Sequence, residues 1–134
     1  TTLKRANILH FCGGSVLYLI SLIKEKGFAE MIVKAVKDDE IIYSGTSAGS
    51  MIASSDLRLS SYDDEDAEFA KKMRDFSGLG LVNFLIIPHV NNKDCTKSNL
   101  QMIEHLPENL QTLIFINDDQ AIWVDDGKLE ILHN

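Results

Sequence analysis

Residues 40–51 read EIIYSGTSAGSM, and the rest of the chain is organised around this stretch. A strand-like run rich in Ile and Tyr reaches Gly45, Ser47 follows, and small and apolar residues continue beyond Gly49. The pattern G-x-S-x-G predicts a strand, a sharp turn and a helix, with the serine at the apex of the turn. The glycines give the crowded turn room, and N–H groups at the start of the helix can meet a developing oxyanion. Turns of this kind also occur for packing reasons, so the pattern needs support from elsewhere in the chain.

The segment before this turn predicts a strand–helix–strand unit whose two strands are parallel and joined by a right-handed crossover. Apolar residues recur at helical spacing between two short apolar runs. The expected elements are a strand at 7–12, a turn at Gly13-Gly14, a helix over 16–23 with Ser15 as N-cap and Gly27 as C-cap, a short helix over 28–36, and a strand at 40–44.

The segment after the turn predicts two more strands and a terminal hairpin. The acidic run at 54–66 is typical of a solvated loop. The expected elements are a helix over 48–53, a helix or mobile lid over 67–76, a strand at 84–87, a loop at 91–98, a helix over 100–106, a strand at 113–116, and a hairpin of 121–124 with 129–132 around Asp125-Asp126-Gly127.

Alternating strands and helices predict a single α/β domain over residues 1–134. Its architecture would be a three-layer α/β/α sandwich around a mostly parallel sheet, with a C-terminal β-hairpin. In such sheets the reacting groups gather at the carboxyl ends of the strands. Four polar or glycine positions each follow a strand run and are expected at that edge: Gly13-Gly14, Ser47, His89 and Asp118-Asp119.

The composition fits one globular domain with a core of its own. The chain has 134 residues, of which 45% are hydrophobic and 25% charged, and a net charge of −7. The absence of a basic patch argues against nucleic acid as a partner, and no apolar run is long enough to span a bilayer. Two cysteines are too few for a disulfide framework or a zinc cage, which favours a cytoplasmic location. Cys12 is expected to be a small buried hydrophobe.

A nucleophilic serine needs a base, and the chain has four histidines. His10 lies inside the first strand, where a packed or hydrogen-bonded core histidine is expected. His105 and His133 are expected at the surface. His89 ends a buried strand behind Pro88, and from there a histidine can reach across neighbouring strand ends to Ser47.

The histidine in turn needs an acid, and the sequence offers more than one. Asp118 and Asp119 end the next strand, while Asp63 lies in the acidic loop that could fold over the site. Asp118 is the preferred candidate. The N–H groups of Gly14 and Ala48 are the expected oxyanion donors. Nothing in the sequence has the spacing of a metal site.

These motifs, taken in order, resemble those of the peptidase E (aspartyl dipeptidase) family, of which cyanophycinase is a relative. The motifs are a strand with G-G and a helix, Y-x-G-x-S-A-G, G-L-G-L, an apolar run with P-H, and a strand ending in acidic residues. The resemblance implies a serine peptidase on a fold like that of class I glutamine amidotransferases. Ser47 would be the nucleophile and His89 its base, with the acid near Asp63 or at Asp118.

This sequence differs from the family pattern in three ways. The family's G-G-N is G-G-S here, with Ser15 at the third position. The basic segment that would hold an N-terminal aspartate of a substrate is thin, and Lys97 is its nearest candidate. Family members begin with further strand–helix units, so roughly 60 N-terminal residues are expected to be missing.

The leading hypothesis is therefore hydrolysis of small peptides, with a preference for Asp-X dipeptides as the family's substrate class. It requires no metal or organic cofactor, and it involves neither nucleic acid nor membrane. A homodimer could cover the sheet edge that the missing units would leave open. The alternatives are a catalytically silent α/β module for assembly or binding, and a cyanophycinase-like or esterase-like serine hydrolase.

Overall fold

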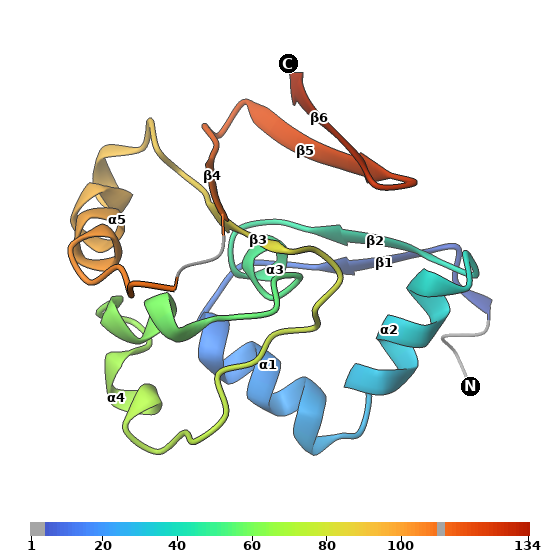
Figure 1. Ribbon diagram of the computed structural model, residues 1–134, viewed down its shortest axis with the longest axis horizontal. Helices are drawn as coiled ribbons and strands as arrows, with labels where there is room; N and C mark the ends of the chain where they lie inside the picture. Colours follow the sequence, from blue (N-terminus) through green and yellow to red (C-terminus); the bar gives the residue numbers. More distant parts are fainter. Residues whose placement is uncertain (1–4, 110–111) are drawn as a thin grey trace.

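The computed structural model describes residues 5–109 and 112–134 of the chain (Figure 1). Within these residues, no helix is both long enough and apolar enough to cross a bilayer. In chain order the elements are β1 Ile8–Phe11, α1 Val16–Glu25, α2 Ala29–Lys37, β2 Ile42–Gly45, α3 Ala48–Met51, the 3-10 turn η2 Arg58–Tyr62, α4 Ala67–Ala70, β3 Phe84–Ile87, the 3-10 turn η3 Lys93–Cys95, α5 Thr96–Ile103, β4 Thr112–Phe115, β5 Gln120–Asp125 and β6 Lys128–His133.

The described strands form three separate pairs. β1 and β2 are parallel, with Phe11 opposite Gly45 at their carboxyl ends. β3 and β4 are also parallel, with Ile87 opposite Phe115. β5 and β6 form an antiparallel hairpin. The predicted α/β class and the parallel strand pairing are confirmed, although the sheets are smaller than a continuous sandwich would have.

One side of the β1–β2 pair is covered by helices, and the other side is open. In Figure 1, α1 and α2 lie on one side of this pair, and the β5–β6 hairpin lies beyond the other. Ile8 is 58% exposed and Ile42 is 52% exposed, and Trp123 on the hairpin is 49% exposed. Apolar side chains therefore face solvent on both the open side of the pair and the hairpin.

This open side explains two wrong predictions. His10 is exposed rather than part of the core, and its ring Nδ1 lies 2.9 Å from the hydroxyl of Ser44 on the paired strand. Cys12 is exposed rather than buried, because it follows β1 at the edge where the strands end. No described element packs over these side chains.

Helix α1 begins at Val16, as the sequence predicts, and ends at Glu25, beyond the predicted end at residue 23. Ser15 has extended backbone angles, and its hydroxyl accepts a hydrogen bond from the N–H of Tyr18 at 3.1 Å, as an N-cap does. Gly27 follows the last turn with a φ of 71°, the left-handed conformation that ends many helices. The cap residues therefore fix the length of the helix that supports the first strand.

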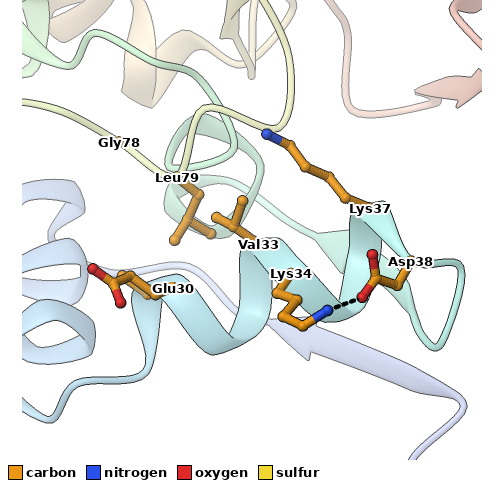
Figure 2. A pocket seen from close by; sticks show the side chains of 8 residues that line it. Glu30, Val33, Lys34, Lys37, Asp38, Gly78 and Leu79 are labelled. Atoms are coloured by element: carbon orange, nitrogen blue, oxygen red, sulfur yellow. Dashed lines mark hydrogen bonds and ion pairs between the residues drawn. The ribbon is translucent and has the colours of Figure 1, made fainter.

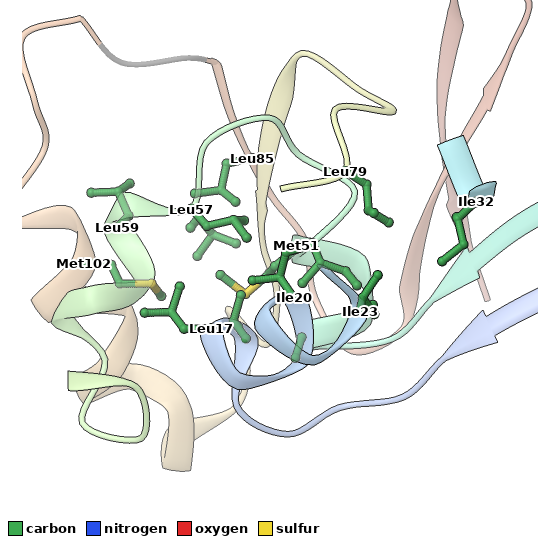
Figure 3. Close-up of a cluster of buried hydrophobic side chains, with 14 residues drawn as sticks. Leu17, Ile20, Ile23, Ile32, Met51, Leu57, Leu59, Leu79, Leu85 and Met102 are labelled. Carbon is green, nitrogen blue, oxygen red and sulfur yellow. The ribbon is translucent and has the colours of Figure 1, made fainter. Parts of the chain in front are cut away.

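The core lies between α1, α3 and β3 (Figure 3). Leu17 and Ile20 from α1 are fully buried, as are Ile52 after α3 and Leu85 in β3. A second, smaller cluster joins β3 to the residue after β4 through Phe84, Ile86 and Ile116. Burying both faces of β3 fixes the position of the residues that follow it.

The acidic segment 54–66 is not the solvated loop that its composition indicates. Leu57 is fully buried and Leu59 is 2% exposed, and both pack in the main core. Asp66 is 1% exposed. Two apolar side chains and one buried carboxylate hold the segment down, while Tyr62, which is 41% exposed, and charged side chains between them reach solvent.

Helix α5 begins earlier than predicted, at Thr96 instead of residue 100, and it ends at Ile103. Part of the predicted loop 91–98 is therefore the turn η3 and the start of the helix. The reason is a local cap, since the side-chain oxygen of Asn92 accepts from the N–H of Asp94 at 3.0 Å. The predicted hairpin is confirmed, and Asp126 and Gly127 both have a positive φ at its turn.

Candidate active site

Ser47 lies at a sharp elbow between β2 and α3. Its backbone angles are φ 52° and ψ −120°, an uncommon conformation for a residue other than glycine. The elbow is tied to the neighbouring strand, because the N–H of Thr46 donates to the carbonyl of Phe11 at 3.0 Å. The strained turn leaves the Ser47 side chain only half-buried at the carboxyl ends of the two strands.

The two glycines of the G-x-S-x-G pattern are required by close backbone packing. A Cβ on Gly45 would lie 2.3 Å from the carbonyl oxygen of Gly49, and a Cβ on Gly49 would lie 2.1 Å from the carbonyl oxygen of Phe11. The hydroxyl of Tyr43 donates to that same Gly49 carbonyl at 2.5 Å, and burial raises the pKa of the Tyr43 phenol. These contacts hold α3 tightly against the ends of β1 and β2.

The side chain of His89 connects Ser47 to Asp118. Its Nε2 lies 2.9 Å from the Ser47 hydroxyl oxygen, and its Nδ1 lies 2.5 Å from Oδ1 of Asp118. His89 follows β3 with a φ of 63°, and Asp118 follows β4, the strand that pairs with β3. The His89 side chain is 32% exposed and the Asp118 side chain 44% exposed. The structure therefore brings together the three side chains that the sequence singles out.

This geometry permits a proton to pass from a hydroxyl to an imidazole. When Asp118 accepts the Nδ1–H of His89, the Nε2 atom is left as an acceptor that faces the Ser47 hydroxyl. A carboxylate next to the ring also stabilises the imidazolium that forms when the proton moves. The arrangement can thus activate the Ser47 oxygen as a nucleophile.

The Gly13-Gly14 turn and the first residue of α3 both adjoin Ser47. A Cβ on Gly13 would lie 3.2 Å from the Ser47 Cβ, so the Gly13-Gly14 turn directly contacts the serine. Ala48 begins α3 immediately after Ser47. Within residues 5–109 and 112–134, no hydrogen-bond acceptor occupies the N–H of Gly14 or of Ala48. Both groups remain candidates for holding an oxyanion.

The competing acids lie elsewhere. Oδ1 of Asp63 accepts from the Ser98 hydroxyl and from the N–H of Glu65, each at 3.0 Å. Asp119 accepts through its backbone carbonyl from the N–H of Asn134. Among the described carboxylates, only Asp118 lies within hydrogen-bonding distance of the His89 ring.

Lys97 does not face the serine as an unpaired cation. Its Nζ lies 2.5 Å from Oδ2 of Asp64, and its side chain is 75% exposed. Gln101 donates to the other oxygen of Asp64 at 3.2 Å. Any role of Lys97 toward a substrate carboxylate would require it to leave Asp64.

Two sets of side-chain contacts were not predicted from the sequence. Asn91 and Asn92 both hydrogen-bond to Asp118. Asp66 accepts from the hydroxyl of Ser15 and from two backbone N–H groups at the start of α1. An asparagine pair in a loop carries no pattern of its own. The buried carboxylate is hidden within a charge run that is typical of a solvated surface.

One surface cavity lies away from these residues. It has a volume of about 490 Å³ and lies between α2 and the Gly78-Leu79 segment (Figure 2). Lys34 at its rim is paired with Asp38. A second, open cavity of about 310 Å³ includes Asp118 and the two ends of the hairpin in its lining. The second cavity is the one next to the candidate site.

The chain matches the model of a known protein family. The model of peptidase family S51 matches residues 1–132. Similar sequences include an uncharacterized peptidase of Pasteurella multocida, 28% identical over 124 residues, which covers 92% of this chain and 58% of the relative. Another is an uncharacterized peptidase of Listeria innocua, 26% identical over 128 residues, which covers 96% of this chain and 60% of the relative.

A solved structure supports the same fold. A candidate peptidase E protein from Listeria monocytogenes superposes with a TM-score of 0.85 at 20% identity, covering 99% of this chain and 62% of that one. At this identity the superposition concerns the fold alone. The chain spans about 60% of the length of these relatives.

Proposed function

The chain belongs to peptidase family S51, and from this membership we propose that it acts, alone or as part of a longer protein, as a serine peptidase on small peptides. The observation that carries the proposal is the continuous chain of short contacts from Ser47 through His89 to Asp118. A Ser-His-Asp arrangement recurs on unrelated folds for acyl transfer, and it is recognised by geometry rather than by sequence position.

In the proposed mechanism, the Ser47 oxygen attacks the carbonyl carbon of the scissile peptide bond while Nε2 of His89 takes the hydroxyl proton. Asp118 keeps the imidazole in the required tautomer and stabilises its positive charge. The N–H groups of Gly14 and Ala48 would hold the negative oxygen of the tetrahedral intermediate.

The C–N bond then breaks, and His89 gives its proton to the leaving amine. The acyl group stays on the Ser47 oxygen as an ester. A water molecule, deprotonated by His89, attacks this ester and releases the carboxylic acid, which restores the serine hydroxyl. Protein side chains and water supply every proton and every nucleophile in this series of reaction steps.

The substrate class that we propose is dipeptide-like, and Asp-X is the first sequence to test. An N-terminal aspartate would need a cation to meet its side-chain carboxylate. Lys97 is the candidate, and its present partner Asp64 would have to be displaced by the substrate carboxylate. If that exchange does not occur, the acidic neighbourhood of the site favours uncharged or basic N-terminal residues instead.

A dipeptide library separates these cases. Purified protein is incubated with dipeptides whose N-terminal residue is Asp, Asn, Ala or Lys, and the released amino acids are quantified by mass spectrometry. We expect hydrolysis that Ser47→Ala abolishes, and a Lys97→Ala variant that loses selectivity for Asp over Asn but retains activity on Ala-X. Hydrolysis that persists in Ser47→Ala would exclude the proposed nucleophile.

A second candidate function, a catalytically silent assembly module, is favoured by the apolar side chains of Ile8, Ile42 and Trp123 that face solvent. In that case a second copy of the chain would cover the open side of β1–β2 and form a homodimer. Light scattering after gel filtration would detect such a dimer, and charged substitutions at Ile8 and Ile42 should dissociate it. A monomer at all concentrations would count against this candidate.

A further inference from the structure

We propose that Asn91 and Asn92 are positioning residues that hold Asp118 against His89, an inference that rests on the peptidase function proposed above. Both follow His89 closely, in the sequence P-H-V-N-N of residues 88–92. Among the described residues, neither side chain hydrogen-bonds to Ser47, and both hydrogen-bond to Asp118, so their effect on the chemistry passes through the acid.

Asp118 is held at three atoms by the turn that carries His89. Its Oδ1 lies 2.5 Å from Nδ1 of His89. Its backbone N–H donates to the side-chain oxygen of Asn91 at 2.9 Å, and its Oδ2 accepts from Nδ2 of Asn92 at 3.3 Å. One main-chain contact and one contact at each carboxylate oxygen fix both the position and the plane of the acid.

The orientation of the Asn92 amide is itself determined. Its oxygen accepts from the N–H of Asp94 at 3.0 Å, and this assigns the NH₂ group to the side that faces Asp118. The Asn92 backbone N–H donates to the carbonyl of His89 at 3.0 Å, which closes the turn. The acid and the base are therefore both held by contacts of the short segment 89–92.

Asp118 needs such a restraint because it is exposed and lies among other negative charges. Its side chain is 44% exposed, so water competes for both of its oxygens. Burial and, after it, the charges of Asp118, Asp94, Asp63 and Glu65 raise the pKa of the Cys95 thiol, so these four carboxylates lie in one neighbourhood. A neutral donor at Asn92 competes with water for Oδ2 of Asp118 without adding charge.

The first test is a double-mutant cycle on kcat. We expect Asn92→Ala to lower kcat for a dipeptide substrate about tenfold, with little change in KM, because a hydrogen bond to a charged group is lost. In the Asp118→Asn background, the same change should have no further effect, since the residue through which it acts is already removed. The matched control is Asn83→Ala. Asn83 is exposed and directly precedes the first residue of β3, at the end of the strand opposite His89, so this substitution should leave kcat unchanged. An additive loss in the double variant would overturn the proposal.

The second test does not depend on catalysis. The Nδ1–H proton of His89, bonded to Asp118, should give a downfield proton NMR signal that is absent from His89→Ala. We expect Asn92→Ala to broaden or remove this signal and Asn83→Ala to retain it. A signal that is unchanged in Asn92→Ala, or missing from the unmodified protein, would overturn the positioning role. If the unmodified protein cleaves no peptide but its signal is lost in Asn92→Ala, the positioning role is supported and the peptidase function is refuted.

Discussion

Replacing Gly49 with alanine should damage both stability and the reactivity of Ser47. The new Cβ would lie 2.1 Å from the carbonyl oxygen of Phe11, whereas real Cβ contacts are essentially never closer than 3.0 Å. α3 and the end of β1 must then separate by about 0.9 Å. Because both sides of the contact are backbone, no side-chain rotation can relieve it.

The magnitude follows from the cost of overpacking. Inserting a methylene into a packed site costs about 1–3 kcal/mol, which corresponds to a fall in melting temperature of roughly 3–12 °C for a domain of this size. A displacement near 1 Å of a catalytic group costs about 10²-fold in rate. We therefore expect Gly49→Ala to melt earlier and to react with a fluorophosphonate about 100-fold more slowly.

Gly80→Ala is the control for backbone strain alone. Gly80 has a φ of 65° but open space around its would-be Cβ, so alanine there costs about 1–2 kcal/mol without a clash. Thermal melting followed by circular dichroism and the labelling rate at fixed probe concentration are the two measurements. We expect Gly80→Ala to melt somewhat earlier with a normal labelling rate. If Gly49→Ala matched the unmodified protein in both measurements, the close-packed elbow would be refuted.

Three further predictions concern carboxylates. Asp118→Asn should lower kcat by about 10³- to 10⁴-fold, because an amide at Nδ1 favours the wrong imidazole tautomer, whereas Asp63→Asn should change kcat by less than about twofold. Equal losses in a steady-state peptide assay would contradict this assignment. Burial raises the pKa of Asp66, so the folded protein disfavours ionisation of this carboxyl. Its contribution to the free energy of unfolding therefore falls as pH rises from the unfolded pKa of 3.8 through the raised folded pKa. Urea unfolding should therefore show Asp66→Asn gaining stability relative to the unmodified protein across that range. The hydrogen bond from Lys24 lowers the pKa of Asp75, so ionised Asp75 stabilises the folded protein. That stabilisation is lost as pH falls below the unfolded pKa of 3.8. Since Asp75 is largely exposed, Asp75→Asn should cost less than about 1 kcal/mol at neutral pH.

The parts of the fold that were predictable are those governed by local chemistry. Ser15 has a side chain that caps a helix, Gly27 can adopt a left-handed conformation, and Asp126-Gly127 suits a tight hairpin turn. Each of these acts within a few residues of its own position. The structure shows all three at the expected places.

The candidate site was predictable in outline because parallel strands bring their carboxyl ends together. Ser47, His89 and Asp118 each follow a strand run, and this shared position selects them from the other serines, histidines and aspartates. The choice between Asp118 and Asp63 could not be made from the sequence. It depends on contacts across the fold, such as the hydrogen bond of Asp63 to Ser98.

Other features were mispredicted because they depend on what covers a face or closes a distant contact. Cys12 and His10 have the composition of a buried strand, but no described element covers their side of β1. Asp66 lies in a run of charges, yet it is buried because the N-terminus of α1, 50 positions away in the chain, supplies N–H donors. Neither outcome has a local signal.

The most direct test of the account is covalent labelling of Ser47. Folded protein is treated with a fluorophosphonate, and the adduct is counted by intact mass and located by peptide mapping. We predict a single adduct on Ser47, lost in Ser47→Ala and strongly slowed in His89→Ala. A folded protein that forms no adduct, or one that labels equally in Ser47→Ala, would contradict the central claim that Ser47 is an activated nucleophile.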